Sequence, residues 1–188
     1  AGVDMLWHRH DAGLAATQAG ADKVLPDATV QAIEQHKVAL KGPCTTPVGE
    51  GFTSVNVALR KQLMLYGAVR PVRSMPGVNT RYTATGVDLV VVRENTEGLY
   101  AGIENQVSEG VVTSLKVVTE KASRRIARFA FEYAASRGRR KLTVLHKANI
   151  MKVTDGLFLK SAREVHQRDY PNIDYQEVII DAGCMKLV

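Results

Sequence analysis

The sequence predicts an α/β fold, chiefly because strand-like and helix-like patterns alternate along the chain. Short runs rich in β-branched residues occur at 87–92, 111–118, 142–146 and 175–180. Over 119–137 and 155–169, apolar residues recur at intervals of three and four, which is typical of helices that bury one face. Neither an internal repeat nor a low-complexity segment interrupts this order.

Composition bounds the class of protein. With 188 residues, 45% of them hydrophobic and 23% charged, the chain is long enough to bury one core or two small ones. Disordered and fibrous classes are therefore excluded. The sequence shows no sign of a secretion signal and no apolar run long enough to span a membrane. Cys44 and Cys184 stand far apart outside any metal-type spacing, which indicates reduced thiols in a cytosolic-type compartment.

The net charge of +6 raises the question of nucleic-acid binding. Lysines and arginines are dispersed and aromatic residues make up only 6% of the chain, unlike a nucleic-acid interface. The one dense cluster, Arg137–Lys141, follows a predicted helix, where cations complement the helix dipole. A site for a polyanionic small molecule explains part of the excess better than DNA does.

The first third of the chain predicts a strand at 3–8, helices at 12–19 and 27–36, a strand at 38–40 and a Gly/Pro/Thr loop at 42–51. A helix is expected over 54–66. Arg70-Pro71 is expected to break it, because the residue before a proline disfavours the helical region. An extended segment, 71–81, then leads to the apolar strand at 87–92, which we expect to be fully buried.

The second half of the chain predicts a regular alternation of elements. One or two strands at 111–118 precede a helix that begins near Thr119 and that Gly138 terminates. The apolar side chains spaced for one face of this helix are Ile126, Phe129, Ala130, Tyr133 and Ala134. A strand at 142–146, a loop at 147–152, a helix at 155–169 and a strand at 175–180 follow. Cys184–Val188 resembles the start of a further helix, and the chain begins without Met on a strand-like alternation, so we interpret it as an internal fragment.

The most informative polar cluster follows the apolar strand at 87–92. Arg93–Glu104 places an arginine, Tyr100 and three carboxylates where the chain leaves this strand. Ligands usually bind at such an edge of an α/β layer, so a site is expected here. Arg70 and Arg73 also lie at element ends. Several converging arginines suit a di- or tricarboxylate, although each alone is typical of a surface ion pair.

A glycine-rich turn, Gly49–Ser54, leads into the next helix. It is one glycine short of a dinucleotide fingerprint, so it is a weak cofactor signal. A helix N-terminus offers unpaired amides to an anion, and Asn56 and Arg60, four residues apart, share a face of this helix. The alternative is a helix capped by Thr53 or Ser54 that carries a surface arginine.

Other candidates are weaker when the residues are considered alone. His8 and His10 share a face of an expected strand, but no third metal ligand is evident and exposed histidines are the simpler interpretation. Asp181 is typical of a helix cap, Tyr100 of a packing residue and Lys147 of a surface lysine.

Several motifs taken together resemble the isocitrate and isopropylmalate dehydrogenase family. They are Lys41–Gly49, Ser54–Lys61, Val69–Arg73, Val92–Glu104 and His146–Lys152. Ser54 and Asn56 match the isocitrate branch, since isopropylmalate enzymes place longer apolar residues on this helix, and the chain is most similar in character to bacterial NAD-linked isocitrate dehydrogenases. The resemblance implies an incomplete three-layer isopropylmalate-dehydrogenase-like fold. Residues 1–65 would be a remnant of the large cofactor domain, and 66–188 a small substrate and dimerisation domain with an arm or clasp at about 103–118.

The resemblance also implies roles for individual residues. The carboxylates of isocitrate would be held by Ser54, Asn56, Arg60, Arg70 and Arg93. Tyr100 would be the general acid that protonates the enolate after decarboxylation. Lys147, contributed across a dimer interface in the family, would help to deprotonate the substrate hydroxyl. Thr45 would lie near the nicotinamide end of the cofactor. Asp181 would be one of three aspartates that coordinate Mg²⁺ or Mn²⁺, with the other two expected beyond Val188.

The implied activity is that of an oxidoreductase, the isocitrate dehydrogenase of the tricarboxylic acid cycle, which forms 2-oxoglutarate with NAD or NADP. We expect a homodimer in the cytoplasm, or in the mitochondrial matrix of a eukaryote, without nucleic-acid or membrane partners. The alternatives are a dehydrogenase for isopropylmalate, homoisocitrate or tartrate, and a non-catalytic regulatory subunit. The 188 residues alone are expected to be inactive, because sequence that holds the dinucleotide is missing from them.

Overall fold

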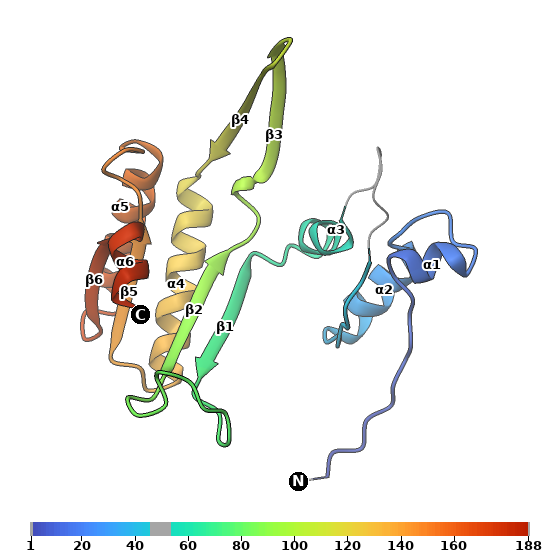
Figure 1. The fold of residues 1–188 in the computed structure, drawn as a ribbon, viewed down its shortest axis with the longest axis horizontal. Helices are drawn as coiled ribbons and strands as arrows, with labels where there is room; N and C mark the ends of the chain where they lie inside the picture. Colours follow the sequence, from blue (N-terminus) through green and yellow to red (C-terminus); the bar gives the residue numbers. More distant parts are fainter. Residues whose placement is uncertain (1, 46–53, 188) are drawn as a thin grey trace. The chain divides into compact units, whose positions relative to one another are not determined.

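The structure is a computed structural model that describes residues 2–45 and 54–187 (Figure 1). The chain separates into two compact units, Ala1–Leu65 and Tyr66–Val188. The first unit contains α1 (Leu14–Gln18), α2 (Asp27–His36) and α3 (Val55–Gln62). The second contains, in order, β1 (Gly67–Arg73), β2 (Asp88–Glu94), β3 (Gly98–Ser108), β4 (Val111–Val117), α4 (Glu120–Ser136), β5 (Lys141–His146), α5 (Thr154–Asp169), β6 (Asp174–Ile179) and α6 (Ile180–Lys186).

The described part of the first unit contains helices joined by irregular chain, without a strand. The helix predicted at 27–36 is confirmed as α2, while those predicted at 12–19 and 54–66 form over shorter ranges. The strands predicted at 3–8 and 38–40 are wrong, because both segments are irregular chain and Val38 is 82% exposed. An alternating pattern becomes a strand only where a neighbour accepts its hydrogen bonds, and no described residue of this unit forms such a neighbour.

The connection between α3 and β1 differs from the predicted one. Arg70-Pro71 does not end the helix: α3 stops at Gln62, and Met64 adopts a left-handed φ of 50° that no helix continues. Pro71 instead lies inside β1, an edge strand, where a missing N–H is tolerated. The extended segment predicted at 71–81 is a strand only as far as Arg73.

Strands β1 and β2 form an antiparallel ribbon with one covered face. The predicted strand at 87–92 is confirmed as β2, but the expectation that it is fully buried is wrong. α4 packs on the face that contains Gly67, where a Cβ atom would meet the side chain of Ile126 at 3.5 Å. The opposite face carries Val91, which is 39% exposed. The apolar run of β2 therefore belongs to a ribbon that is covered on one face only.

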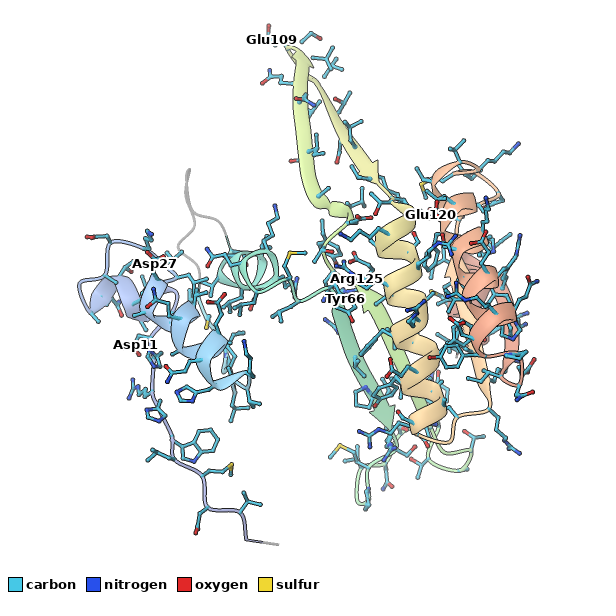
Figure 2. The ribbon with its side chains drawn as sticks, turned by 180° about the vertical axis from the view of Figure 1, so that it is seen from behind. Asp11, Asp27, Tyr66, Glu109, Glu120 and Arg125 are labelled. Atoms are coloured by element: carbon cyan, nitrogen blue, oxygen red, sulfur yellow. The ribbon has the colours of Figure 1, made fainter. Side chains whose placement is uncertain are left out.

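Strands β3 and β4 form a long antiparallel hairpin. Figure 2 shows Glu109 at the tip of this hairpin and Glu120 at the first turn of α4. Its strands are largely exposed, with Leu99 at 68% and Val112 at 67%. The strand predicted within 111–118 is confirmed as β4, and Tyr100 lies on β3.

The core of the second unit lies between α4, α5 and the parallel pair β5–β6. Phe131 is fully buried there, and its ring stacks on Tyr170 with centroids 5.4 Å apart. The predicted boundaries of α4 are confirmed: the Thr119 hydroxyl accepts the N–H of Ala122 at 3.2 Å, and Gly138 follows the helix with a φ of +62°. The helix predicted at 155–169 and the strands at 142–146 and 175–180 also form, each within about a residue.

Candidate functional site

Arg70 and Arg93 lie on the same face of the β1–β2 ribbon. In the register, Arg70 opposes Val91 and Arg93 opposes Ala68, so the two arginines are diagonal neighbours on the face that points away from α4. The Arg93 guanidinium carbon lies 5.2 Å from the centre of the Tyr100 ring. The structure therefore brings together three of the predicted site residues.

Asn95 positions Arg93, and no specific signal in the sequence pointed to it. Its side chain is only 7% exposed, its Oδ1 accepts the Arg93 Nε–H at 3.0 Å, and its own N–H bonds to the Tyr66 carbonyl at 2.8 Å. The backbone bond fixes the place of Asn95 in the chain, and its side-chain oxygen holds the Arg93 Nε–H, with the Arg93 guanidinium beside the Tyr100 ring. Only the place of Asn95, directly after an apolar strand, hinted at this function.

The carboxylates of the 93–104 stretch hold the turn between β2 and β3. Glu94 accepts the N–H groups of Thr96 and Glu97, both at 2.7 Å. Glu97 in turn accepts the N–H of Thr119 at 2.9 Å and its hydroxyl at 2.6 Å, and Thr119 is the N-cap of α4. These charge-assisted hydrogen bonds fix the chain between Arg93 and Tyr100 to the start of α4.

Lys147 and Asp181 meet at the carboxyl ends of parallel strands. His146 opposes Ile179 in the β5–β6 register, so the residues that follow each strand emerge at the same edge. The Lys147 ammonium forms an ion pair with the Asp181 carboxylate in the first turn of α6. This hydrogen bond holds the pKa of the Asp181 carboxyl below its usual value.

Asp155 is a residue of this region that sequence patterns did not predict. It is 6% exposed, its carboxylate accepts the Lys147 N–H at 2.7 Å, and it pairs with the Lys116 ammonium. Lys116 belongs to β4, so one buried carboxylate joins the hairpin to the loop that carries Lys147. An aspartate in the first turn of a helix is common, and nothing in its spacing revealed these partners.

The surroundings of Asp181 suit a metal ligand only in part. Asp181 offers carboxylate oxygens, which Mg²⁺ and Mn²⁺ prefer, on a side chain that is 66% exposed. Within the ranges 2–45 and 54–187, however, no group of three potential ligands gathers there or elsewhere. Asp181 thus offers oxygen ligands of the kind that a divalent ion prefers, and the described residues do not complete a group of three ligands around it.

The remaining predicted residues belong to the first unit. Asn56 and Arg60 lie half-buried on α3 and Ser54 is its N-cap, although its side chain makes no capping hydrogen bond. Thr45 is exposed, and its carbonyl accepts the Leu14 N–H at 2.9 Å. The glycine-rich turn at 49–53 lies outside the described residues.

Two further basic or histidine-rich features have structural contacts. Arg73 and Arg139 both pair with Asp88, at 3.1 and 2.6 Å, so part of the Arg137–Lys141 cluster is neutralised within the chain. The His8 ring stacks on His36 with centroids 4.9 Å apart. Neither around this pair nor elsewhere do the described residues form a group of three potential metal ligands. Across the described residues, no helix is both long and apolar enough to cross a membrane.

Comparison with known proteins places this fold and site in a family. The profile described as isocitrate/isopropylmalate dehydrogenase matches residues 1–188. The chain belongs to the isocitrate/isopropylmalate dehydrogenase family, as its motifs predicted. The crystal structure of isocitrate dehydrogenase from Methylococcus capsulatus matches it with a TM-score of 0.90 and 46% identity, covering 98% of this chain and 55% of the other. The α/β fold of this family is thereby confirmed.

Curated relatives come from both branches of the family. Catalytic subunit 5 of the mitochondrial NAD isocitrate dehydrogenase of Arabidopsis thaliana is 50% identical over 188 residues, which are 100% of this chain and 49% of the relative. Regulatory subunit 2 of the same plant's enzyme is 52% identical, covering 88% of this chain and 44% of the relative. The chloroplastic 3-isopropylmalate dehydrogenase of Solanum tuberosum is 48% identical, covering 99% of this chain and 51% of the relative. The chain spans about half the length of the curated relatives it matches.

Proposed function

We propose that the protein is a subunit of an NAD-dependent isocitrate dehydrogenase that oxidises and decarboxylates isocitrate to 2-oxoglutarate. The observation that carries the proposal is the convergence of Arg70, Arg93 and Tyr100 at one face of the β1–β2 ribbon and the adjoining strand. Two arginines bind carboxylates bidentately, and a phenol beside them donates a proton. The motifs at Ser54 and Asn56 favour isocitrate over isopropylmalate, and both branches appear among the relatives.

Each of these residues has a defined task in the proposed reaction. Arg70 and Arg93 hold the carboxylates of isocitrate, with Ser54, Asn56 and Arg60 on α3 as further ligands. The amine of Lys147 takes up the hydroxyl proton. In the ion pair with Asp181 this lysine is an ammonium, so it must lose a proton and leave that contact before it acts as a base. Tyr100 then protonates the carbon of the enolate that remains after CO₂ has left.

Two groups from outside these residues complete the chemistry. Thr45 would lie near the nicotinamide end of a bound NAD or NADP, which would supply the hydride acceptor. Asp181 would be one ligand of a bound Mg²⁺ or Mn²⁺, which would supply Lewis-acid polarisation of the carbonyl and so favour decarboxylation. We place the 188 residues as the substrate-binding part of the enzyme, with 1–65 belonging to the cofactor domain and 66–188 to the small domain.

Steady-state kinetics on the protein that carries this chain test the proposal. Isocitrate with NAD is expected to be turned over faster than isopropylmalate, homoisocitrate or tartrate. Tyr100→Phe is expected to lower kcat by roughly 10²–10⁴, because it removes the proton donor without removing the ring. Arg93→Ala is expected to raise KM. Arg73→Ala is the matched control, because Arg73 is paired with Asp88, and it is expected to change neither KM nor kcat. A preference for isopropylmalate, or a Tyr100→Phe enzyme with unchanged kcat, would contradict the proposal.

We further propose that the protein forms a homodimer in which Lys147 acts in the partner's site. Mixing Tyr100→Phe and Lys147→Ala subunits tests this by complementation. In a shared-site dimer one of the two sites is intact, so random mixing restores about a quarter of the wild-type activity. If Tyr100 and Lys147 act within one chain, every site stays defective and no activity returns.

A regulatory subunit is the second candidate function. The observation that favours it is the 52% identity to regulatory subunit 2 of the Arabidopsis thaliana enzyme. Such a subunit binds a citrate-type ligand and does not turn over isocitrate by itself. Retention of Arg93, Tyr100 and Lys147 favours catalysis, and turnover by the homomeric protein distinguishes the two. We place the protein in the cytoplasm, or in the mitochondrial matrix of a eukaryote, where the two relatives from Arabidopsis are named as mitochondrial.

A further inference from the structure

A hollow of about 390 Å³ lies along α4, and no step of the proposed reaction uses it. Its walls include two rings, Tyr66 and Phe129, which meet edge-on with centroids 6.0 Å apart. Four further wall residues are cationic and are spaced so that they share one helical face: Lys121, Arg124, Arg125 and Arg128. Figure 2 shows Arg125 beside Tyr66, and its guanidinium carbon lies 4.2 Å from the centre of that ring. We call this hollow the α4 pocket.

The cations of the α4 pocket are only partly neutralised. Arg124 pairs with Glu120 and Glu164, but Lys121 forms no ion pair with any residue that the structure describes. Arg128 lies 3.7 Å from the carboxylate of Asp169, which already accepts two shorter hydrogen bonds, 2.7 and 2.8 Å, from its neighbour Arg168. Lys121 and Arg128 thus retain donors that a ligand can occupy.

Arg125 adds a buried donor. Its Nε atom is buried and has no hydrogen-bond partner among the described residues. Its Nη2 atom donates a hydrogen bond to the Thr96 hydroxyl at 3.1 Å and lies 3.5 Å from Glu94, whose oxygens already accept the Thr96 and Glu97 N–H groups at 2.7 Å. The guanidinium lines the pocket beside the Tyr66 ring, so it adds positive charge and its outer nitrogens to this wall.

We propose that the α4 pocket binds a small multivalent oxyanion, with Lys121, Arg125 and Arg128 as its donors. Multivalent charge is required because three separate cations face the hollow, whereas one charge would leave two of them unmatched. The ring walls exclude water on one side and so strengthen the attraction. Glu132, at the far end, repels an anion and limits the length of the ligand. The proposal does not depend on the proposed enzymatic function.

Phosphate and carboxylate groups share this chemistry, and titration distinguishes them. Calorimetric titration of the protein that carries this chain, at low ionic strength, with inorganic pyrophosphate and separately with citrate, is expected to show binding of at least one. Lys121→Ala and Arg128→Ala are each expected to weaken it about tenfold, since each removes a charged hydrogen-bond donor. Glu132→Gln is expected to tighten it. Arg137→Ala is the matched control, because this exposed arginine at the end of α4 lies over Tyr133, outside the pocket. Circular dichroism confirms that each variant is folded.

Each outcome of the titration decides for or against the proposal. Tighter binding of pyrophosphate identifies phosphorylated ligands, and tighter binding of citrate identifies polycarboxylates. Absence of binding for both probes overturns the proposal. Binding that Arg93→Ala abolishes, while Lys121→Ala and Arg128→Ala leave it unchanged, assigns the anion to the substrate face and also overturns it. A loss in Arg137→Ala as large as that in Arg128→Ala shows unspecific charge attraction and does the same.

Discussion

Replacement of Asp155 by alanine is expected to destabilise the second unit and to free the Lys147 loop. The Asp155 carboxylate is 6% exposed and accepts the Lys147 N–H at 2.7 Å while it pairs with Lys116. The Lys147 N–H is partly buried, and leaving it without an acceptor costs about 1–2 kcal/mol. The Lys116 side chain is 28% exposed, so water solvates its ammonium once the ion pair with Asp155 is gone. Loss of this ion pair therefore adds only about 0.5–1 kcal/mol. We therefore expect the free energy of unfolding to fall by about 1.5–3 kcal/mol.

Urea denaturation followed by circular dichroism measures this loss, and amide hydrogen exchange at Lys147 locates it. Asp155→Asn keeps an oxygen acceptor but no charge, so we expect about half the loss. Asp174→Ala is the matched control, because its side chain is 67% exposed and only 3.9 Å from Lys141; its change should stay within about 0.5 kcal/mol. An Asp155→Ala protein as stable as the control, or one with unchanged exchange at Lys147, would refute the reasoning.

Three further predictions concern the core and the pH dependence of stability. Phe131→Ala should lower the free energy of unfolding by about 3–5 kcal/mol in urea denaturation, because the ring is fully buried. The hydrogen bond from Arg163 lowers the pKa of the Glu177 carboxyl, so the ionised carboxylate stabilises the fold above the usual glutamate pKa and less as pH falls. The difference in free energy of unfolding between the wild-type protein and Glu177→Gln should therefore shrink between about pH 5 and pH 3. Burial raises the pKa of the Tyr175 phenol, so stability should be full below about pH 10 and fall above it, less so in Tyr175→Phe.

The second unit could be predicted from the sequence far better than the first, for a physical reason. α4 and α5 carry a long apolar face, and Thr119 and Gly138 mark the ends of α4 by local chemistry alone. The strand predicted at 3–8 rested on alternation alone, and alternation does not reveal whether a pairing neighbour exists. For the same reason the apolar run of β2 predicted a strand but overestimated its burial.

The candidate site was predicted residue by residue but its contacts were not. Arg93 and Tyr100 are seven positions apart, so their proximity across a turn is a local matter. Lys147 and Asp181 are 34 positions apart and meet only because β5 and β6 run parallel, which no local pattern states. Asn95 and Asp155 escaped prediction because burial and partner geometry, rather than residue type, define their functions.

The β3–β4 hairpin is fastened at its base on both strands. Glu97, just before β3, holds the N-cap of α4, and Lys116, near the end of β4, holds Asp155 on α5. Both strands are thus held at the base of the hairpin, and its free end is the tip at Glu109. The Asp155 carboxylate that pairs with Lys116 also accepts the Lys147 N–H, so we expect a partner bound along the hairpin to alter the position of Lys147.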